Sequence, residues 1–255
     1  MSKRSNWAIP YFIFLVLFVV LPLVLIVVYA LQDGNGSFTL SNVTRFFTDS
    51  DALSTFAVSV EVAIENTLIC LLLGYPAAYI LADKNLNKSA VTVILFILPM
   101  WINALMRTLA TAELFNVFGF TLGKGTLLFG MVYDYLPFMI YPIYNVLAKL
   151  DRSYLEAAQD LGATPWKVFW KVTVPLSMPG VTSGVLMVFM PTVSTFAISE
   201  FLTNNKIKLF GTIIQENINA SMWNYGAALA FFMLIIIGIS TMFSGNNKEA
   251  EGALI

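Results

Sequence analysis

Carboxylates within long apolar segments are the side chains of this sequence best suited to chemistry. Asp134 lies inside one such segment, Glu65 inside another, and Glu200 at the end of a third. An ionisable group is costly inside a membrane, so each is a candidate for function. Trp101 and Tyr135 are near enough in the sequence to supply aromatic faces. Separated carboxylates with aromatic faces between them suit an elongated cation, and these five residues are the predicted substrate path.

Each of these residues also has a structural interpretation. Tyr and Trp side chains often form belts at the membrane–water interfaces. Asp134 or Glu65 could pair with Arg107 as a structural bridge, and Glu200 could face outer water. Both interpretations stay open at this point.

Several kinds of catalytic site are excluded. The chain has no His, which rules out His-based acid–base catalysis, Ser-His triads and His metal sites. Its one cysteine, Cys70, cannot build a cysteine zinc site. The Gly119–Gly125 segment approaches a phosphate-binding loop, but it has three residues between its glycines and Gly125 in place of the Ser or Thr that binds magnesium. We therefore predict a turn there, and no catalytic residue, metal or cofactor on this chain.

The composition indicates a membrane protein. Of the 255 residues, 58% are hydrophobic and only 11% are charged, whereas globular proteins average about 25% charged. Each apolar run reaches the roughly 20 residues that a membrane-spanning helix needs. Prolines inside the runs, such as Pro99 and Pro137, are expected to be tolerated as kinks. The six predicted spans are Trp7–Leu31, Val58–Ala82, Val91–Ala110, Thr126–Leu147, Leu176–Ser199 and Trp223–Phe243.

The distribution of Lys and Arg predicts the orientation. With the N-terminus inside, inner segments hold nine basic residues and outer segments hold four. This asymmetry favours both termini in the cytoplasm. The first span could instead be a cleaved signal peptide, but its apolar run is longer than usual for one, so we expect a retained helix.

The segment from Lys149 to Pro175 has the character of a platform. Ser153 and Glu156 fit a capping box, which predicts a helix start. Gly162 suits the left-handed residue that ends this helix, and Thr164 followed by proline would start a second one. The platform could be an interfacial helix anchored by tryptophans, or a docking surface for another protein.

The sequence from Glu156 to Ala163, with the prolines and glycine of Pro175–Gly180 downstream, resembles the EAA signature of ABC importer permeases. This resemblance implies that the segment is a cytoplasmic coupling helix that sits in a cleft of a separate ATPase. The residues that it assigns to this contact are Arg152, Glu156, Ala157, Ala158, Asp160, Gly162 and Ala163.

Further motifs narrow the resemblance. Leu73–Tyr79, Leu98–Asn103 with Arg107, and Leu136–Met139 are similar to spermidine/putrescine permeases of the PotB type. The resemblance implies an all-α, type I ABC importer permease fold with six transmembrane helices, in the cell (plasma or inner) membrane, and a coupling helix between spans four and five. It also implies a small cationic substrate, a second permease subunit, two ATPase subunits that bind ATP and Mg, and an extracytoplasmic binding protein. Nucleic acid is not an expected partner.

The expected organisation has three parts. Residues 1–57 hold the first helix and external loop, residues 58–243 form the core with its coupling loop at 149–175, and residues 244–255 form a short cytoplasmic tail. Glu216, Trp223 and Asn224 lie near the last outer loop and could contact a delivery protein or only solvent. The alternatives are an importer permease for an amino acid, metal or oxyanion, an ion-gradient-driven carrier, and a membrane subunit that transports nothing.

Overall fold

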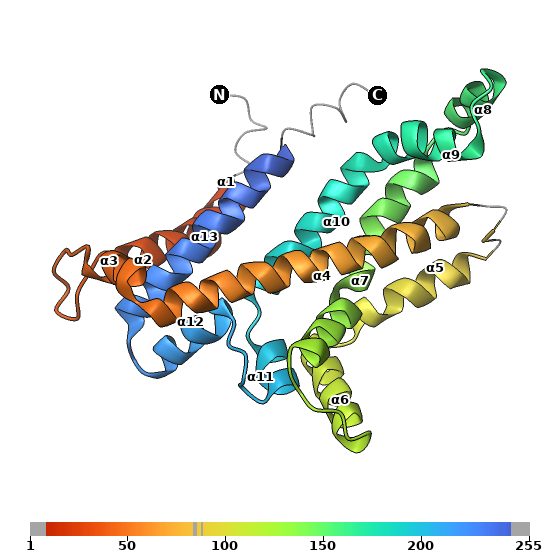
Figure 1. Cartoon of the computed structure of the whole chain (residues 1–255). Helices are drawn as coiled ribbons and strands as arrows, with labels where there is room; N and C mark the ends of the chain where they lie inside the picture. The colour runs from red at the N-terminus through yellow and green to blue at the C-terminus, as the bar shows by residue number, and fades with distance from the viewer. Residues whose placement is uncertain (1–8, 84–85, 88, 246–255) are drawn as a thin grey trace.

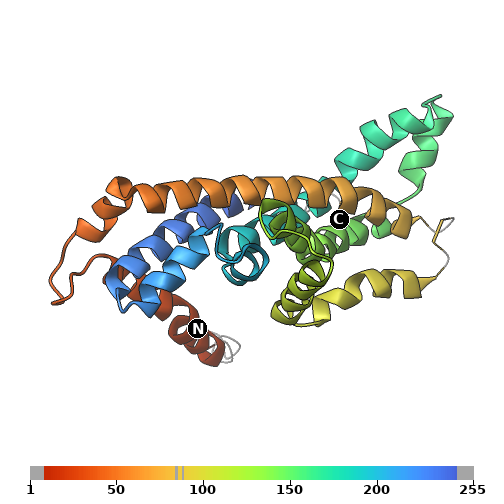
Figure 2. The same cartoon turned by 60° about the horizontal axis from the view of Figure 1, so that its bottom comes forward.

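The computed structural model describes residues 9–83, 86–87 and 89–245, and Figure 1 draws them as a tilted bundle of helices. α8 and α9 project from one end of the bundle, whereas α3 and α12 lie toward the opposite end (Figures 1 and 2). The elements are α1 (Ile9–Leu15), η2 (Val16–Val20), α2 (Leu21–Ala30), α3 (Ser41–Thr48), α4 (Ser50–Ala82), α5 (Ala90–Ile97), η3 (Leu98–Trp101), α6 (Ala104–Val117), α7 (Lys124–Lys149), α8 (Ser153–Asp160), α9 (Pro165–Val168), η4 (Phe169–Thr173), α10 (Val174–Ser194), α11 (Ala197–Thr203), α12 (Phe210–Asn219) and α13 (Trp223–Gly245). The first two residues of the predicted first span and residues 246–255 of the predicted tail lie outside the described residues.

Six membrane spans are consistent with this helical content. Five helical runs are long and apolar enough to cross a membrane, and a bent pair, Val91–Trp101 with Ala104–Val117, makes up to six. The five runs are Ile9–Ala30, Ser50–Ala82, Lys124–Lys149, Pro165–Ser194 and Trp223–Met242.

The third span is broken, which corrects the prediction of one continuous helix over Val91–Ala110. The two halves meet at 91°. Pro99 lies in the 3-10 turn η3, where the α-helical hydrogen bonds end. Asn103 then starts α6, because its side-chain oxygen accepts hydrogen bonds from Leu105 N and Met106 N at 2.9 and 3.4 Å.

The bounds of the second and fifth spans also differ from the prediction. α4 begins at Ser50 rather than Val58, because the Asp49 carboxylate accepts hydrogen bonds from the first free amides of the helix. The division expected between residues 57 and 58 therefore falls inside α4. The fifth span begins at Pro165 and ends at Ser194, because the π-helical turn η4 joins α9 to α10 without a break.

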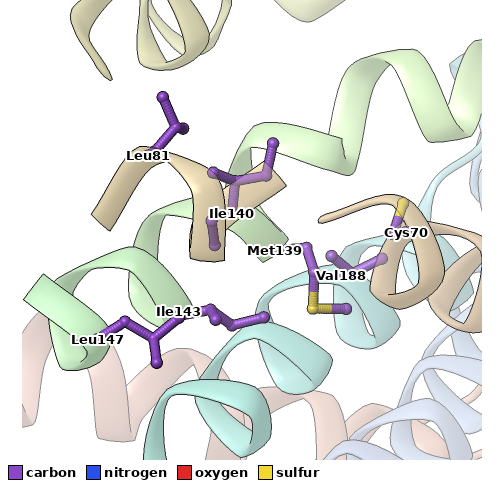
Figure 3. Close-up of a cluster of buried hydrophobic side chains, with 8 residues drawn as sticks. Cys70, Leu81, Met139, Ile140, Ile143, Leu147 and Val188 are labelled. Carbon is purple, nitrogen blue, oxygen red and sulfur yellow. The ribbon is translucent and has the colours of Figure 1, made fainter. Parts of the chain in front are cut away.

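The core lies where α4, α7 and α10 pack together. Two glycines on α10 let its backbone approach α7, as the small-residue spacing implies. A Cβ at Gly180 would lie 2.9 Å from the Pro142 carbonyl oxygen, and one at Gly184 would lie 3.1 Å from the Met139 carbonyl oxygen. Figure 3 shows the labelled members of the buried cluster beside this contact, which are Cys70, Leu81, Met139, Ile140, Ile143, Leu147 and Val188.

Three short helices, α3, α11 and α12, were not expected from the sequence. They cover the end of the bundle opposite α8 (Figure 1). Phe46 of α3 packs with Phe210 of α12 and Tyr225 of α13 in a separate buried cluster. A search for long apolar runs misses such short helices, because they are too short and too mixed in polarity to stand out in hydropathy.

Candidate functional site

The predicted coupling segment is a helix followed by a sharp elbow. α8 begins at Ser153, as expected, but the cap is different from the predicted capping box. The Asp151 carboxylate accepts a hydrogen bond from Ser153 N at 2.9 Å, and this bond holds the pKa of Asp151 below its usual value. Asp151 is therefore the side chain that caps α8, and Ser153 already belongs to the first turn.

Gly162 makes the elbow. Its φ is +81°, a backbone conformation that glycine adopts without the clash that a Cβ brings. No atom lies within 4 Å of the position where a Cβ would stand, so conformation rather than space favours glycine here. Ala163 N donates to the Ala158 carbonyl at 3.0 Å and Gly162 N donates to the Gln159 carbonyl at 2.8 Å, which closes the end of the helix.

The side chains of α8 make few contacts with the rest of the described chain. None of its residues is buried. Leu161, at the elbow, is 90% exposed. Tyr154 and Trp166 are also exposed, so the two sides of the elbow present several large apolar side chains to their surroundings.

The second half of the elbow is anchored to the bundle. α9 begins at Pro165, as predicted, and Trp166 stacks on Phe169 with ring centroids 6.2 Å apart. The Phe169 ring in turn contacts Tyr75 and Tyr79 of α4 edge-on, at 5.9 and 5.5 Å. The Phe169 ring therefore packs the elbow against α4, and η4 joins it to α10 without a break.

Arg152 links the start of α8 to the end of α4. Its guanidinium lies 3.3 Å from the Asp83 carboxylate, and its side chain is half exposed. An exposed pair of this kind contributes little stability, about 0–1 kcal/mol.

Asp134, the most embedded acid, is buried and already paired. It is 1% exposed, and its Oδ1 lies 3.3 Å from Arg107 Nη2. The Thr108 hydroxyl donates to Asp134 Oδ2 at 3.0 Å. This is the structural bridge that the sequence left open as an alternative to a substrate contact.

Glu65 and Glu61 share one lysine. Lys124 Nζ lies 2.7 Å from Glu61 Oε1 and 2.9 Å from Glu65 Oε1. Both carboxylates lie on one face of α4, as their spacing of one turn requires. Lys124 is the lysine of the near-miss phosphate loop. That segment starts with a turn, in which Gly119 has φ +71°, but its Lys124 and Gly125 already belong to α7.

The other path candidates lie on separate elements. Trp101 of η3 is 87% exposed, whereas Tyr135 of α7 packs against two buried clusters. The prediction that Glu200 ends the fifth span is wrong. That span ends at Ser194, and Glu200 lies half-buried on the separate helix α11. The structure brings Glu61 and Glu65 together, and Asp134 to Arg107.

A polar groove of about 820 Å³ opens at the end of the bundle opposite α8. Tyr225 donates its hydroxyl to Asp49 Oδ2 at 2.7 Å, and the Arg45 guanidinium lies 4.0 Å over the Tyr225 ring. The Tyr225 hydrogen bond holds the pKa of Asp49 below its usual value. Lys208 Nζ lies 2.7 Å from Glu216 Oε1 on the same groove.

The sequence pointed to Glu61 and Glu216 separately, but not to the groove that both of them line. Its walls come from α3, α4, α12 and α13, far apart in the chain. No local spacing could have joined them.

Known proteins resemble this chain over most of its length. Residues 5–247 match the family described as "Binding-protein-dependent transport system inner membrane component". The "Spermidine/putrescine transport system permease protein PotB" of Escherichia coli (strain K12) is 34% identical over 249 residues, which cover 88% of this chain and 90% of that protein. The protein of the same name from Haemophilus influenzae is 31% identical over 252 residues, covering 89% of this chain and 88% of that protein.

Solved structures resemble it in fold. A bacterial ABC transporter involved in import of the acidic polysaccharide alginate superposes with a TM-score of 0.71 at 18% identity, over 96% of this chain and 98% of that chain. The MetNI methionine ABC transporter superposes with a TM-score of 0.62 at 14% identity, over 78% of this chain and 94% of that chain.

These matches confirm the predicted helical permease fold and the prediction of a transport subunit rather than an enzyme. The chain is a multi-pass inner-membrane permease subunit of an ABC importer, and it belongs to the family of binding-protein-dependent transport system inner membrane components.

Proposed function

We propose that this chain carries polyamines of the spermidine/putrescine type into the cell. The observation that carries the proposal is the 34% identity, over 88% of the chain, to a protein named for spermidine/putrescine transport. The carboxylates of Glu61 and Glu65 on α4 are compatible with a cationic cargo.

The coupling step is assigned to α8. We infer that α8 and its exposed Leu161 enter a cleft of a separate ATPase, with Glu156, Ala157 and Ala158 on the contacting helix. The small side chains of Ala157 and Ala158 permit a close approach, and Gly162 sets the angle of the helix. Asp160, Ala163 and Arg152 complete the proposed contact. In this proposal ATP and Mg bind to two ATPase subunits, and this chain itself holds no cofactor for ATP hydrolysis.

The orientation follows from that assignment. α8 faces the cytoplasm, the chain ends share its side of the membrane, and the polar groove faces outward. A loaded extracytoplasmic binding protein docks over the groove, which Glu216 lines. ATP binding closes the ATPase pair, the packed rings at Phe169 transmit the closure to α4 and α10, and the bundle switches between two packed states.

The proposed organisation keeps three parts, but the core begins with α4 at Ser50 rather than at residue 58, and a second permease subunit lies beside it. For the substrate path we favour Glu65 and Glu200 over Asp134. The first two are partly accessible to solvent, whereas the carboxylate of Asp134 is buried against Arg107. Trp101 is exposed enough to face a cavity shared with the second subunit.

Uptake of labelled spermidine into vesicles tests the cargo. The vesicles contain this chain with its second permease subunit and ATPase, and the binding protein is added outside. Uptake that requires internal ATP and is competed by unlabelled putrescine supports the proposal. ATPase activity stimulated by the loaded binding protein without spermidine uptake would retain the importer and reject the polyamine. Gradient-driven uptake by this chain alone would reject the coupling assignment.

A further inference from the structure

Arg107 has hydrogen-bond donors that the chain does not use. Its side chain is 5% exposed, and Nη2 is the atom that faces Asp134. Among the described residues, neither Nε nor Nη1 has a partner. Leaving the donors of a buried cation unpaired costs more than leaving a neutral group unpaired, so a partner is expected to complete this site.

These donors belong to a side chain that lines a groove of about 530 Å³ between α6 and α7. Its walls are mainly aromatic and aliphatic, and include Phe115, Phe118, Phe129 and Tyr133. The Tyr133 ring lies 5.6 Å from the Arg107 guanidinium carbon. An occupant must therefore present apolar groups to the walls and one acceptor, preferably anionic, to Arg107.

The depth of Arg107 argues for a carboxylate rather than a phosphate. Its partner Asp134 lies ten residues from Lys124, the nearer end of α7, which is about 15 Å at 1.5 Å per residue. Phospholipid phosphates stay at the level of the headgroups, and acyl chains carry no acceptor at that depth. A side chain on another helix reaches this depth without moving a headgroup.

We propose that the groove between α6 and α7 receives a transmembrane helix of the second permease subunit, whose acidic side chain accepts hydrogen bonds from Arg107. Exposed apolar residues of α6 outside the groove lining extend the contact beyond the groove, with Leu105 43% and Val117 72% exposed. Arg107 thus binds carboxylates on two sides, one within this chain and one across the interface. The inference rests on the proposed function only for the existence of that second subunit.

Photo-crosslinking in the assembled transporter tests the contact. Phe129 lines the groove and is 57% exposed, so the replacement Phe129→p-benzoylphenylalanine keeps an aromatic ring there. We expect crosslinks to the second permease subunit. The same replacement at Phe38, which is 75% exposed in the loop between α2 and α3, is the matched control and should give few. Crosslinks to lipid alone from Phe129, or equal yields from both positions, would overturn the proposal.

A double substitution tests the charge. Arg107→Met with Asp134→Leu removes both buried charges of this chain together, so the fold does not retain an unpaired ion. The chain should insert and melt as before, while the crosslink yield from Phe129 falls by about tenfold or more, the loss expected when one side of a buried charge contact is removed. An undiminished yield would overturn the role of Arg107. Spermidine uptake is measured in parallel to separate the two proposals. Absence of the Phe129 crosslink in the wild-type background rejects this interface, whereas a normal crosslink without spermidine uptake rejects the polyamine cargo.

Discussion

Arg107 Nη2 lies 3.3 Å from Asp134 Oδ1, and both side chains are at least 95% buried. The pair joins α6, the second half of the broken span, to the middle of α7. A buried ion pair is weak support for stability in itself, but removal of one partner leaves an uncompensated charge.

We therefore predict that Asp134→Asn acts first on folding. The substitution should lower the free energy of unfolding by about 3–5 kcal/mol, because Arg107 keeps its charge in an apolar site. The midpoint of thermal unfolding in detergent measures this effect. Glu113→Gln on the exposed face of α6 is the matched control and should change the midpoint little. A normally stable Asp134→Asn protein with reduced uptake would return Asp134 to the substrate path.

The number of spans could be predicted from the sequence because apolar length is a property of each segment. The break at Pro99 could not be predicted, because a proline interrupts some membrane helices but leaves others continuous. Pro76 and Pro137 lie inside continuous helices, whereas Pro99 is followed by Asn103, whose side chain starts a new one. The outcome depends on which tertiary partners take up the freed backbone groups.

Gly180 should be intolerant of even one methyl group. In Gly180→Ala the new Cβ would meet the backbone of Pro142 and Ile143 at 2.9 and 3.0 Å, and backbone cannot move aside as a side chain can. We expect a loss of about 1–3 kcal/mol in unfolding free energy, measured by thermal melting. At Gly238 of α13 no atom lies within 4 Å of the new Cβ, so Gly238→Ala should be neutral or stabilising. Equal losses at both positions would contradict the packing of α10 on α7.

Gly162→Ala should disturb coupling more than folding. A Cβ at φ +81° costs about 1–2 kcal/mol, and the strain falls on the elbow beside α8. We expect fewer spermidine molecules transported per ATP hydrolysed by the assembled transporter. Gly119→Ala imposes similar strain at φ +71°, in the turn before α7, and should leave this ratio unchanged. The same ratio in both variants would show that the elbow angle does not matter.

The Tyr225–Asp49 hydrogen bond predicts a pH-dependent contribution to stability. The pKa of Asp49 is lowered in the folded protein, so this contribution is complete above the unfolded carboxyl pKa of about 3.9 and is lost as the pH falls through the lower folded value. Tyr225→Phe keeps the ring under Arg45 and removes the hydroxyl. It should cost about 1 kcal/mol at neutral pH and progressively less below about pH 4.

Thermal melting of both proteins across this pH range measures the difference. Tyr29→Phe, which removes a phenol from a half-exposed ring on α2, is the control. A difference that stays constant down to about pH 3 would mean that the carboxylate is not the acceptor that matters.

The elbow at Gly162 could be found in the sequence because its residues are consecutive, glycine adopts positive φ without strain, and Pro165 has a fixed φ that suits a helix start. The partners of the acids could not be assigned in the same way. Arg107 meets Asp134, and Lys124 joins Glu61 to Glu65, through packing between helices that no spacing reveals.

ATP-dependent spermidine uptake with a bulky side chain on α8 tests the central claim most directly. Ala158→Trp would fill the face of α8 that we propose approaches the ATPase, whereas Ala158→Ser keeps that face small. In vesicles with the complete transporter, we predict at least about a tenfold loss of uptake for Ala158→Trp, with the chain still assembled in the membrane, and near wild-type uptake for Ala158→Ser. Full ATP-dependent uptake by a well-assembled Ala158→Trp transporter would contradict the assignment of α8 as the coupling helix.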